Sequence, residues 1–118
     1  MGLFTKQNKG NNANSKNDGF LKINVTKDGD EYTFFLEGRL SSITSSELDH
    51  EINKVIDNAK KLTFDLLELE YISSTGLRVL LGALQNMEDK GETVVRNLTP
   101  AVYDIFELTG FKNLFNIK

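Results

Sequence analysis

The chain has 118 residues, 39% of them hydrophobic, and its 14 Lys and Arg against 17 Asp and Glu leave a net charge of −3. This length suits a single domain, and the acidic balance argues against a dedicated nucleic-acid binder. The chain has no Cys and one His, His50, which excludes disulfide scaffolds, cysteine nucleophiles and His/Cys metal sites. We expect neither a metal nor a cofactor.

The first 18 residues are predicted to form a disordered tail that precedes a domain of residues 19–118. They include five Asn, three Lys and one Asp, with too little apolar surface to offset the entropy of ordering. Residues 19–118 therefore hold 11 basic and 16 acidic residues, a net charge of −5. Because no apolar run approaches the ~18 residues of a membrane span and the start lacks a secretory signal, we expect a cytoplasmic protein without membrane insertion.

The domain is predicted to begin with a β-hairpin. Residues 20–26 alternate apolar and polar side chains, residues 27–30 (KDGD) have the composition of a turn, and residues 31–37 are rich in strand formers. Residues 38–43 are expected to form a loop.

A helix is predicted to open at Thr44, with Glu47 three residues later completing a capping-box pattern. Its apolar face is formed by Leu48, Ile52, Val55, Ile56 and Ala59. A short strand at 62–67, a helix at 74–90 and a strand at 93–98 follow.

The last predicted helix has Thr99 as its N-cap, Pro100 at its first position and Gly110 at its end. A final strand is expected at 114–117. The element order β-β-α-β-α-β-α-β predicts an α/β fold: a mixed, mostly parallel sheet with an N-terminal hairpin whose first strand is an antiparallel edge, packed with helices.

Three hydroxyl residues, Ser73, Ser74 and Thr75, precede Gly76 at the start of the 74–90 helix. A hydroxyl at this place commonly caps the helix. It could also accept a phosphate, which would meet free N–H groups and the positive end of the helix dipole. The residue types alone leave both roles open.

The segment YISSTGLRVLL (71–81), preceded by Asp65, resembles the signature of STAS domains, which occur as bacterial anti-sigma factor antagonists and as cytoplasmic tails of sulphate transporters. LEGRL (36–40), LTPAV (98–102) and LTGF (108–111) resemble further segments of that family. Together the matches span the predicted domain.

The resemblance implies a regulatory binding protein that is not an enzyme. The antagonists are phosphorylated on the first hydroxyl of the Ser-Ser/Thr-Gly run, which matches Ser74, with Ser73 and Thr75 as alternates. The implied partners are an anti-sigma factor that is also a serine kinase, bound by the unphosphorylated domain, and a PP2C-type phosphatase; a monomer or weak dimer is expected. The expected partner-binding residues are Gly38, Arg39, Ser41, Ser42, Ser73, Ser74, Thr75, Gly76 and Arg78.

Three residues depart from the family pattern: Ser73 and Ser41 stand where Asp is usual, and Arg39 replaces Glu. These departures keep a second hypothesis open, a constitutive adaptor or scaffold subunit of a transport or signalling complex. A small phosphotransferase is disfavoured because the chain has no phosphate-binding loop and no evident base.

The remaining candidates have structural interpretations. Gly76 is expected to let the helix start pack closely on the sheet, and Arg78 and His50 to be solvent-exposed. Asp65, Glu68 and Glu70 are interpreted as a solvated acidic rim, with Asp65 capping nearby backbone.

Overall fold

A computed structural model describes residues 20–118 of the protein, so the predicted tail at 1–18 lies outside the described residues. The elements are, in chain order, β1 (Leu21–Asp28), β2 (Glu31–Leu40), α2 (Ser45–Val55), η3 (Ile56–Asn58), β3 (Lys61–Ile72), α3 (Ser74–Met87), β4 (Glu92–Arg96), α4 (Pro100–Thr109), η4 (Phe111–Asn113) and β5 (Asn116–Ile117).

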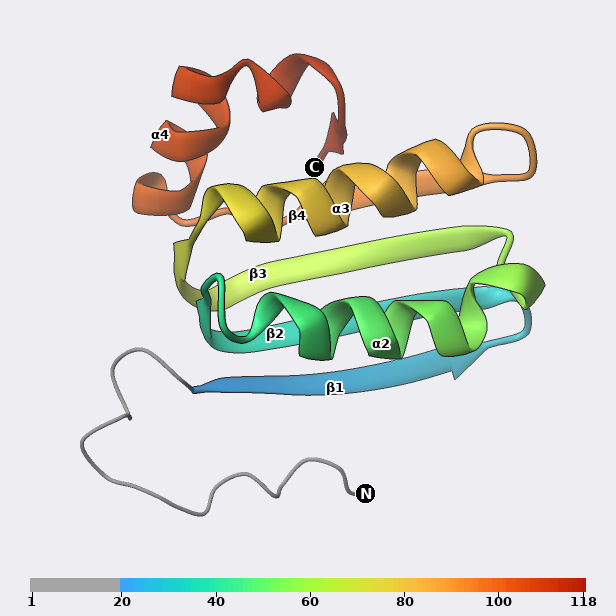
Figure 1. Cartoon of the computed structure of the whole chain (residues 1–118). Coiled ribbons are helices and arrows are strands. Elements are labelled where there is room, and N and C mark those ends of the chain that lie inside the picture. Colours follow the sequence, from blue (N-terminus) through green and yellow to red (C-terminus); the bar gives the residue numbers. More distant parts are fainter. Residues whose placement is uncertain (1–19) are drawn as a thin grey trace.

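The strands form one sheet in the order β1-β2-β3-β4-β5. β1 and β2 pair antiparallel through a turn in which Gly29 takes a φ of 64°, and the other neighbours pair parallel. The predicted α/β fold with an antiparallel edge strand is confirmed. Helices α2 and α3 lie side by side over one face of this sheet (Figure 1).

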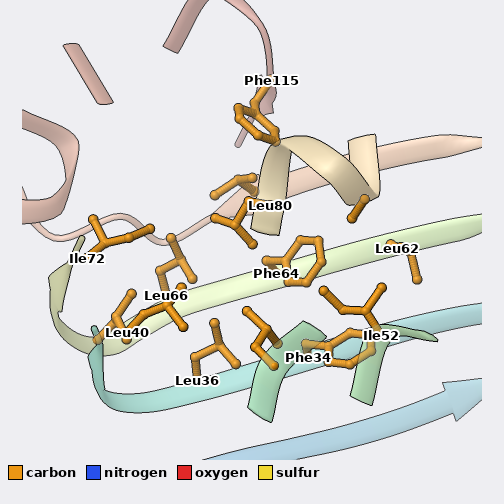
Figure 2. Packing of buried hydrophobic residues seen from close by; sticks show 14 of the residues in the cluster. Phe34, Leu36, Leu40, Ile52, Leu62, Phe64, Leu66, Ile72, Leu80 and Phe115 are labelled. Carbon is orange, nitrogen blue, oxygen red and sulfur yellow. The ribbon is translucent and has the colours of Figure 1, made fainter. Parts of the chain in front are cut away.

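The core lies between that face and the helices (Figure 2). Alternate residues of β2 point inward and are buried, and the Phe34 ring lies 5.3 Å from the ring of Phe64 on β3. Helix side chains such as Ile52 and Leu80 close over them. This packing fixes the register of β2 against β3, because a slip by one residue would turn every inward side chain outward.

β3 is longer than predicted. It extends five residues beyond Leu67, to Ile72, and its pairing with β2 shifts register between Phe35 and Glu37 and again between Gly38 and Arg39. These irregularities are β-bulges, which place extra residues on one strand. The buried residues at the end of β3 are therefore three positions apart, namely Leu66, Leu69 and Ile72. This spacing differs from the two-residue period expected of a strand. The predicted end of this strand at residue 67 was wrong for this reason.

β2 is also longer than predicted, since Gly38, Arg39 and Leu40 belong to the strand and only the following residues form a loop. The register partner of Leu40 is Ile72. The ends of β2 and β3 are therefore side by side immediately before the two helices begin.

Helix boundaries differ by small amounts from those predicted. The α-helix after Thr44 ends at Val55 and continues as the single 3₁₀ turn η3, and α3 ends at Met87 rather than Lys90. In α4 the Thr99 hydroxyl accepts a hydrogen bond from the Val102 N–H, and Gly110 ends the helix with a φ of 82°, as predicted. The final strand is limited to two residues, Asn116 and Ile117, because Leu114 and Phe115 form a turn and a bend after η4.

Candidate functional site

The hydroxyl run lies where β3 passes into α3. The Ser73 N–H donates to the Leu40 carbonyl at 2.8 Å, which continues the sheet pairing to the last residue before the helix. The Ser73 side chain then accepts a hydrogen bond of 3.0 Å from the Gly76 N–H. Ser73 is thus the N-cap of α3, and its hydroxyl is engaged in holding the helix start.

Ser74 is the first residue of α3 and is exposed. Among the described residues its hydroxyl has no hydrogen-bond partner. The N–H groups of the first helical turn have no acceptor within the helix apart from caps, and the helix dipole places partial positive charge there. A phosphate on Ser74 would therefore meet a favourable electrostatic environment without breaking an existing contact.

Gly76 makes the close contact between α3 and the sheet. A Cβ atom on Gly76 would lie 2.7 Å from Cγ of Leu40 and 3.0 Å from its carbonyl oxygen. The predicted packing role of Gly76 is confirmed: without a side chain, the helix start can lie directly on the end of β2.

The loop before α2 is held by its own hydroxyl groups. The Thr44 hydroxyl donates to the Arg39 carbonyl at 2.8 Å and accepts from the Ser41 N–H at 2.9 Å, while the Thr44 N–H donates to the Ser41 hydroxyl. Thr44 has helical backbone angles and makes no side-chain cap bond to α2. The predicted capping box was wrong because this hydroxyl turns back to the loop.

Arg39 lies on the sheet opposite Tyr71, and its guanidinium carbon lies 4.4 Å from the centre of the Tyr71 ring. Its Nε atom is buried and has no hydrogen-bond partner among the described residues. The pair is a cation–π contact at the end of the sheet that carries Ser73.

A groove of about 330 Å³ separates α2 from α3. Of the predicted partner-binding residues, Ser42, Thr75 and Arg78 line it, and Arg78 is exposed, as expected. Gly38, Arg39, Ser41, Ser73, Ser74 and Gly76 do not line it. The predicted surface is therefore divided between this groove and the β2–β3 ends beside it.

The sequence reasoning missed the α2 wall of the groove. That wall includes Ser46, Asp49 and Asn53, whose spacings of three and four place them on one side of a helix. These polar residues lie beside the apolar face of the same helix, and this pattern in the sequence could have identified them. His50, in the same helix, is exposed as predicted.

Asp65 is not part of a solvated rim, which corrects that expectation. It is 6% exposed, and its carboxylate accepts hydrogen bonds from the Leu67 N–H (3.1 Å), Arg96 Nε (2.9 Å) and Asn97 Nδ2 (3.0 Å). The capping part of the prediction is confirmed, and Asp65 also ties β3 to the end of β4. Glu68 and Glu70 are exposed.

Within residues 20–118, no group of three or more His, Cys, Asp or Glu side chains is arranged to hold a metal ion. In the same part of the chain, no helix combines the length and apolarity needed to cross a bilayer.

Comparisons with known proteins agree with one another. The STAS domain family matches residues 22–118. A putative anti-sigma factor antagonist, BtrV of Bordetella bronchiseptica, is 34% identical over 99 residues, covering 82% of this chain and 85% of that protein.

Two solved structures share the fold. The crystal structure of an anti-sigma factor antagonist from Mycobacterium paratuberculosis superposes with a TM-score of 0.77 at 22% identity, covering 83% of this chain and 85% of that one. The phosphorylated form of the Bacillus cell fate determinant SpoIIAA superposes with a TM-score of 0.66 at 17% identity, covering 84% and 91%. At these identities the superpositions show the fold.

Proposed function

The chain belongs to the STAS domain family, and from that premise we propose that it is an anti-sigma factor antagonist controlled by phosphorylation of Ser74. Unphosphorylated, it binds an anti-sigma factor that is also a serine kinase. The kinase transfers the γ-phosphoryl group of ATP to the Ser74 oxygen, ADP leaves, and a PP2C-type phosphatase later hydrolyses the phosphoserine. The protein is a regulator in the cytoplasm and catalyses no reaction itself.

The observation that carries this proposal is the difference among the three neighbouring hydroxyls. Ser73 is committed to the Gly76 N–H, Thr75 is half-buried at the groove wall, and Ser74 is exposed and without a partner among the described residues. A kinase can reach Ser74 without unfolding the helix start. The relative named as an antagonist supports the role.

The effect of the phosphate follows from its charge. It adds nearly two negative charges to residues 19–118, which already carry a net −5. At a closely packed interface these charges cost desolvation and repel acidic groups of a partner. Phosphorylation is therefore expected to release the anti-sigma factor.

The test uses the cognate kinase, ATP and mass spectrometry on the wild type, Ser74→Ala and Ser73→Thr. Wild type and Ser73→Thr, which keeps a capping hydroxyl, should each gain one phosphate on Ser74, and Ser74→Ala should gain none. Phosphate on Ser73 or Thr75 in the wild type would refute the site.

A binding measurement separates the switch from a constitutive adaptor. The unphosphorylated protein should bind the anti-sigma factor, and the phosphorylated protein should bind it at least tenfold more weakly. Equal binding of both forms, or recovery of a transport complex instead of the kinase, would favour the adaptor.

A further inference from the structure

β1 is an edge strand whose outer side is unpaired within residues 20–118. The Arg39 N–H donates to the Phe20 carbonyl at 2.9 Å, and the next cross-strand pair is Leu21 opposite Gly38. Hydrogen-bonded pairs alternate along an antiparallel ladder, so the even-numbered residues of β1 direct their backbone groups toward β2. The odd-numbered residues Leu21, Ile23, Val25 and Lys27 direct theirs outward.

This edge carries Lys22 and Lys27, and charged side chains of this kind discourage pairing with another strand, but it has neither a proline nor a bulge. β1 pairs with β2 over eight residues without a register shift, contains no proline, and forms the outer border of the sheet in Figure 1. Val25 is 38% exposed on the side that faces the helices. A long, regular edge of this kind is a template for a further strand.

The charges on β1 are unevenly matched. Asp28 lies opposite Glu31 on β2, a like-charged pair that is unfavourable in a sheet. Lys22, at the other end of β1, lies opposite Glu37. Lys22 and Asp28 form no ion pair with any described residue. The strand thus has a cation near its start that faces an acid on β2 without a close ion pair, and an anion at its end that faces a like charge.

We propose that β1 pairs antiparallel with β1 of a second copy of this chain, with Val25 facing Val25 across a two-fold axis. In this register the outward-facing odd residues hydrogen-bond to odd residues, as the ladder requires. Lys22 then faces Asp28 of the second copy, and Asp28 faces Lys22, in non-hydrogen-bonded pairs where side chains are closest. In each copy, Lys22 of the second copy then lies beside the like-charged pair Asp28 and Glu31 and offsets the repulsion between them.

The charge match is what favours a second copy over an unrelated strand. The interaction is isologous, and joins two five-stranded sheets into one continuous sheet. The paired stretch runs from Lys22 to Asp28 in each copy, fewer residues than the about 20–30 per side of a standard interface. The dimer is therefore weak, and it leaves Ser74, the first residue of α3, uncovered.

Sedimentation velocity of the full chain over a concentration series tests the association. The wild type should show a concentration-dependent monomer–dimer equilibrium, and Val25→Lys, which sets two lysines face to face, should remain monomeric. Leu108→Lys is the matched control, since Leu108 is 86% exposed on α4, and it should dimerise as the wild type does. A wild type that is monomeric to millimolar concentration, or a Val25→Lys variant that still dimerises, would overturn the proposal.

Charge exchange tests the pairing partners. Lys22→Asp and Asp28→Lys should each weaken the dimer by at least about threefold, because each replaces two opposite-charge cross-strand pairs with two like-charge pairs. The double variant, which exchanges the two charges, should recover wild-type affinity. Additive weakening in the double variant would contradict the pairing.

Cysteine cross-linking tests the register, because the chain has no Cys of its own. The proposed register places Asn24 opposite Thr26 of the second copy. A mixture of Asn24→Cys and Thr26→Cys chains should therefore give disulfide-linked heterodimers on oxidation, and neither variant alone should cross-link efficiently. Efficient Asn24→Cys homodimers would instead indicate a register centred on Asn24 and would exclude the proposed one.

Discussion

At the scale of single residues, the neighbours Ser73 and Ser74 divide two roles that one residue type can perform. Ser73 accepts the Gly76 N–H and is the cap, whereas Ser74 points to solvent. The sequence identified the three-hydroxyl run, but the choice between cap and free hydroxyl depends on where the helix begins. That boundary is set by the Ser73 N–H bond to Leu40, a contact between distant parts of the chain.

The capping role gives a first prediction. Ser73→Ala should lower the free energy of unfolding by about 1 kcal/mol, because the Gly76 N–H loses its acceptor. Ser73→Asp should retain most of the stability, since a carboxylate also caps and favours the positive helix end. Urea denaturation measures both, with Ser74→Ala as the control expected to change the value by less than about 0.5 kcal/mol. A larger loss for Ser74→Ala than for Ser73→Ala would reverse the assignment.

Asp65 gives a second prediction. Asp65→Ala should lower the free energy of unfolding by about 2 kcal/mol, because three donors lose a buried charged acceptor. Arg96 can turn toward water, since its side chain is 39% exposed, and this limits the loss. Glu68→Ala, an exposed acid of the same strand, should change stability by less than about 0.5 kcal/mol. Equal effects of the two changes would restore the solvated-rim interpretation.

At the scale of elements, β3 shows where sequence patterns stop being informative. The short apolar run at residues 62–67 predicted a strand, and that part is correct. Beyond Leu67 the bulges break the two-residue period, so the exposed residues Leu67 and Glu68 are adjacent. Bulges arise from pairing with β2, and no local pattern within β3 records that pairing. The extra length carries Ser73 and Ser74 to the end of the sheet.

Two glycines of α3 provide a matched pair for a third prediction. Gly76→Ala should lower the free energy of unfolding by about 1–3 kcal/mol, because the added methyl group meets Leu40. Gly82→Ala should raise it by about 0.5–1 kcal/mol, since a Cβ there has nothing within 4 Å and alanine favours the helix. Thermal and urea unfolding of the two variants measure the difference. Stabilisation by Gly76→Ala would show that α3 does not rest on β2 as described.

At the scale of the whole molecule, the order of elements was the most predictable property. Turn residues such as Gly29 and Gly110 and the Thr99-Pro100 helix start have local causes, and the structure places them as predicted. Strand direction and the edge position of the first strand then followed from the alternation of strands and helices. The groove between α2 and α3 was not predictable in this way, because it depends on how two separate helices face each other.

The extent of the folded unit gives a last prediction, and we propose that it is residues 19–118. Deleting residues 1–18 should change the free energy of unfolding by less than about 0.5 kcal/mol and leave the urea m-value unchanged, because that slope follows the surface exposed on unfolding. Deleting residues 1–23 should cost at least about 2 kcal/mol, since it also removes Leu21, which is 8% exposed in the core, and the Phe20 carbonyl that accepts from Arg39. Urea titrations of the full chain and of the two deletion variants measure these free energies and m-values. If the shorter deletion lowered stability as much as the longer one, residues 1–18 would belong to the domain, and the charge available to oppose a phosphate on Ser74 would be that of the whole chain, −3, rather than −5.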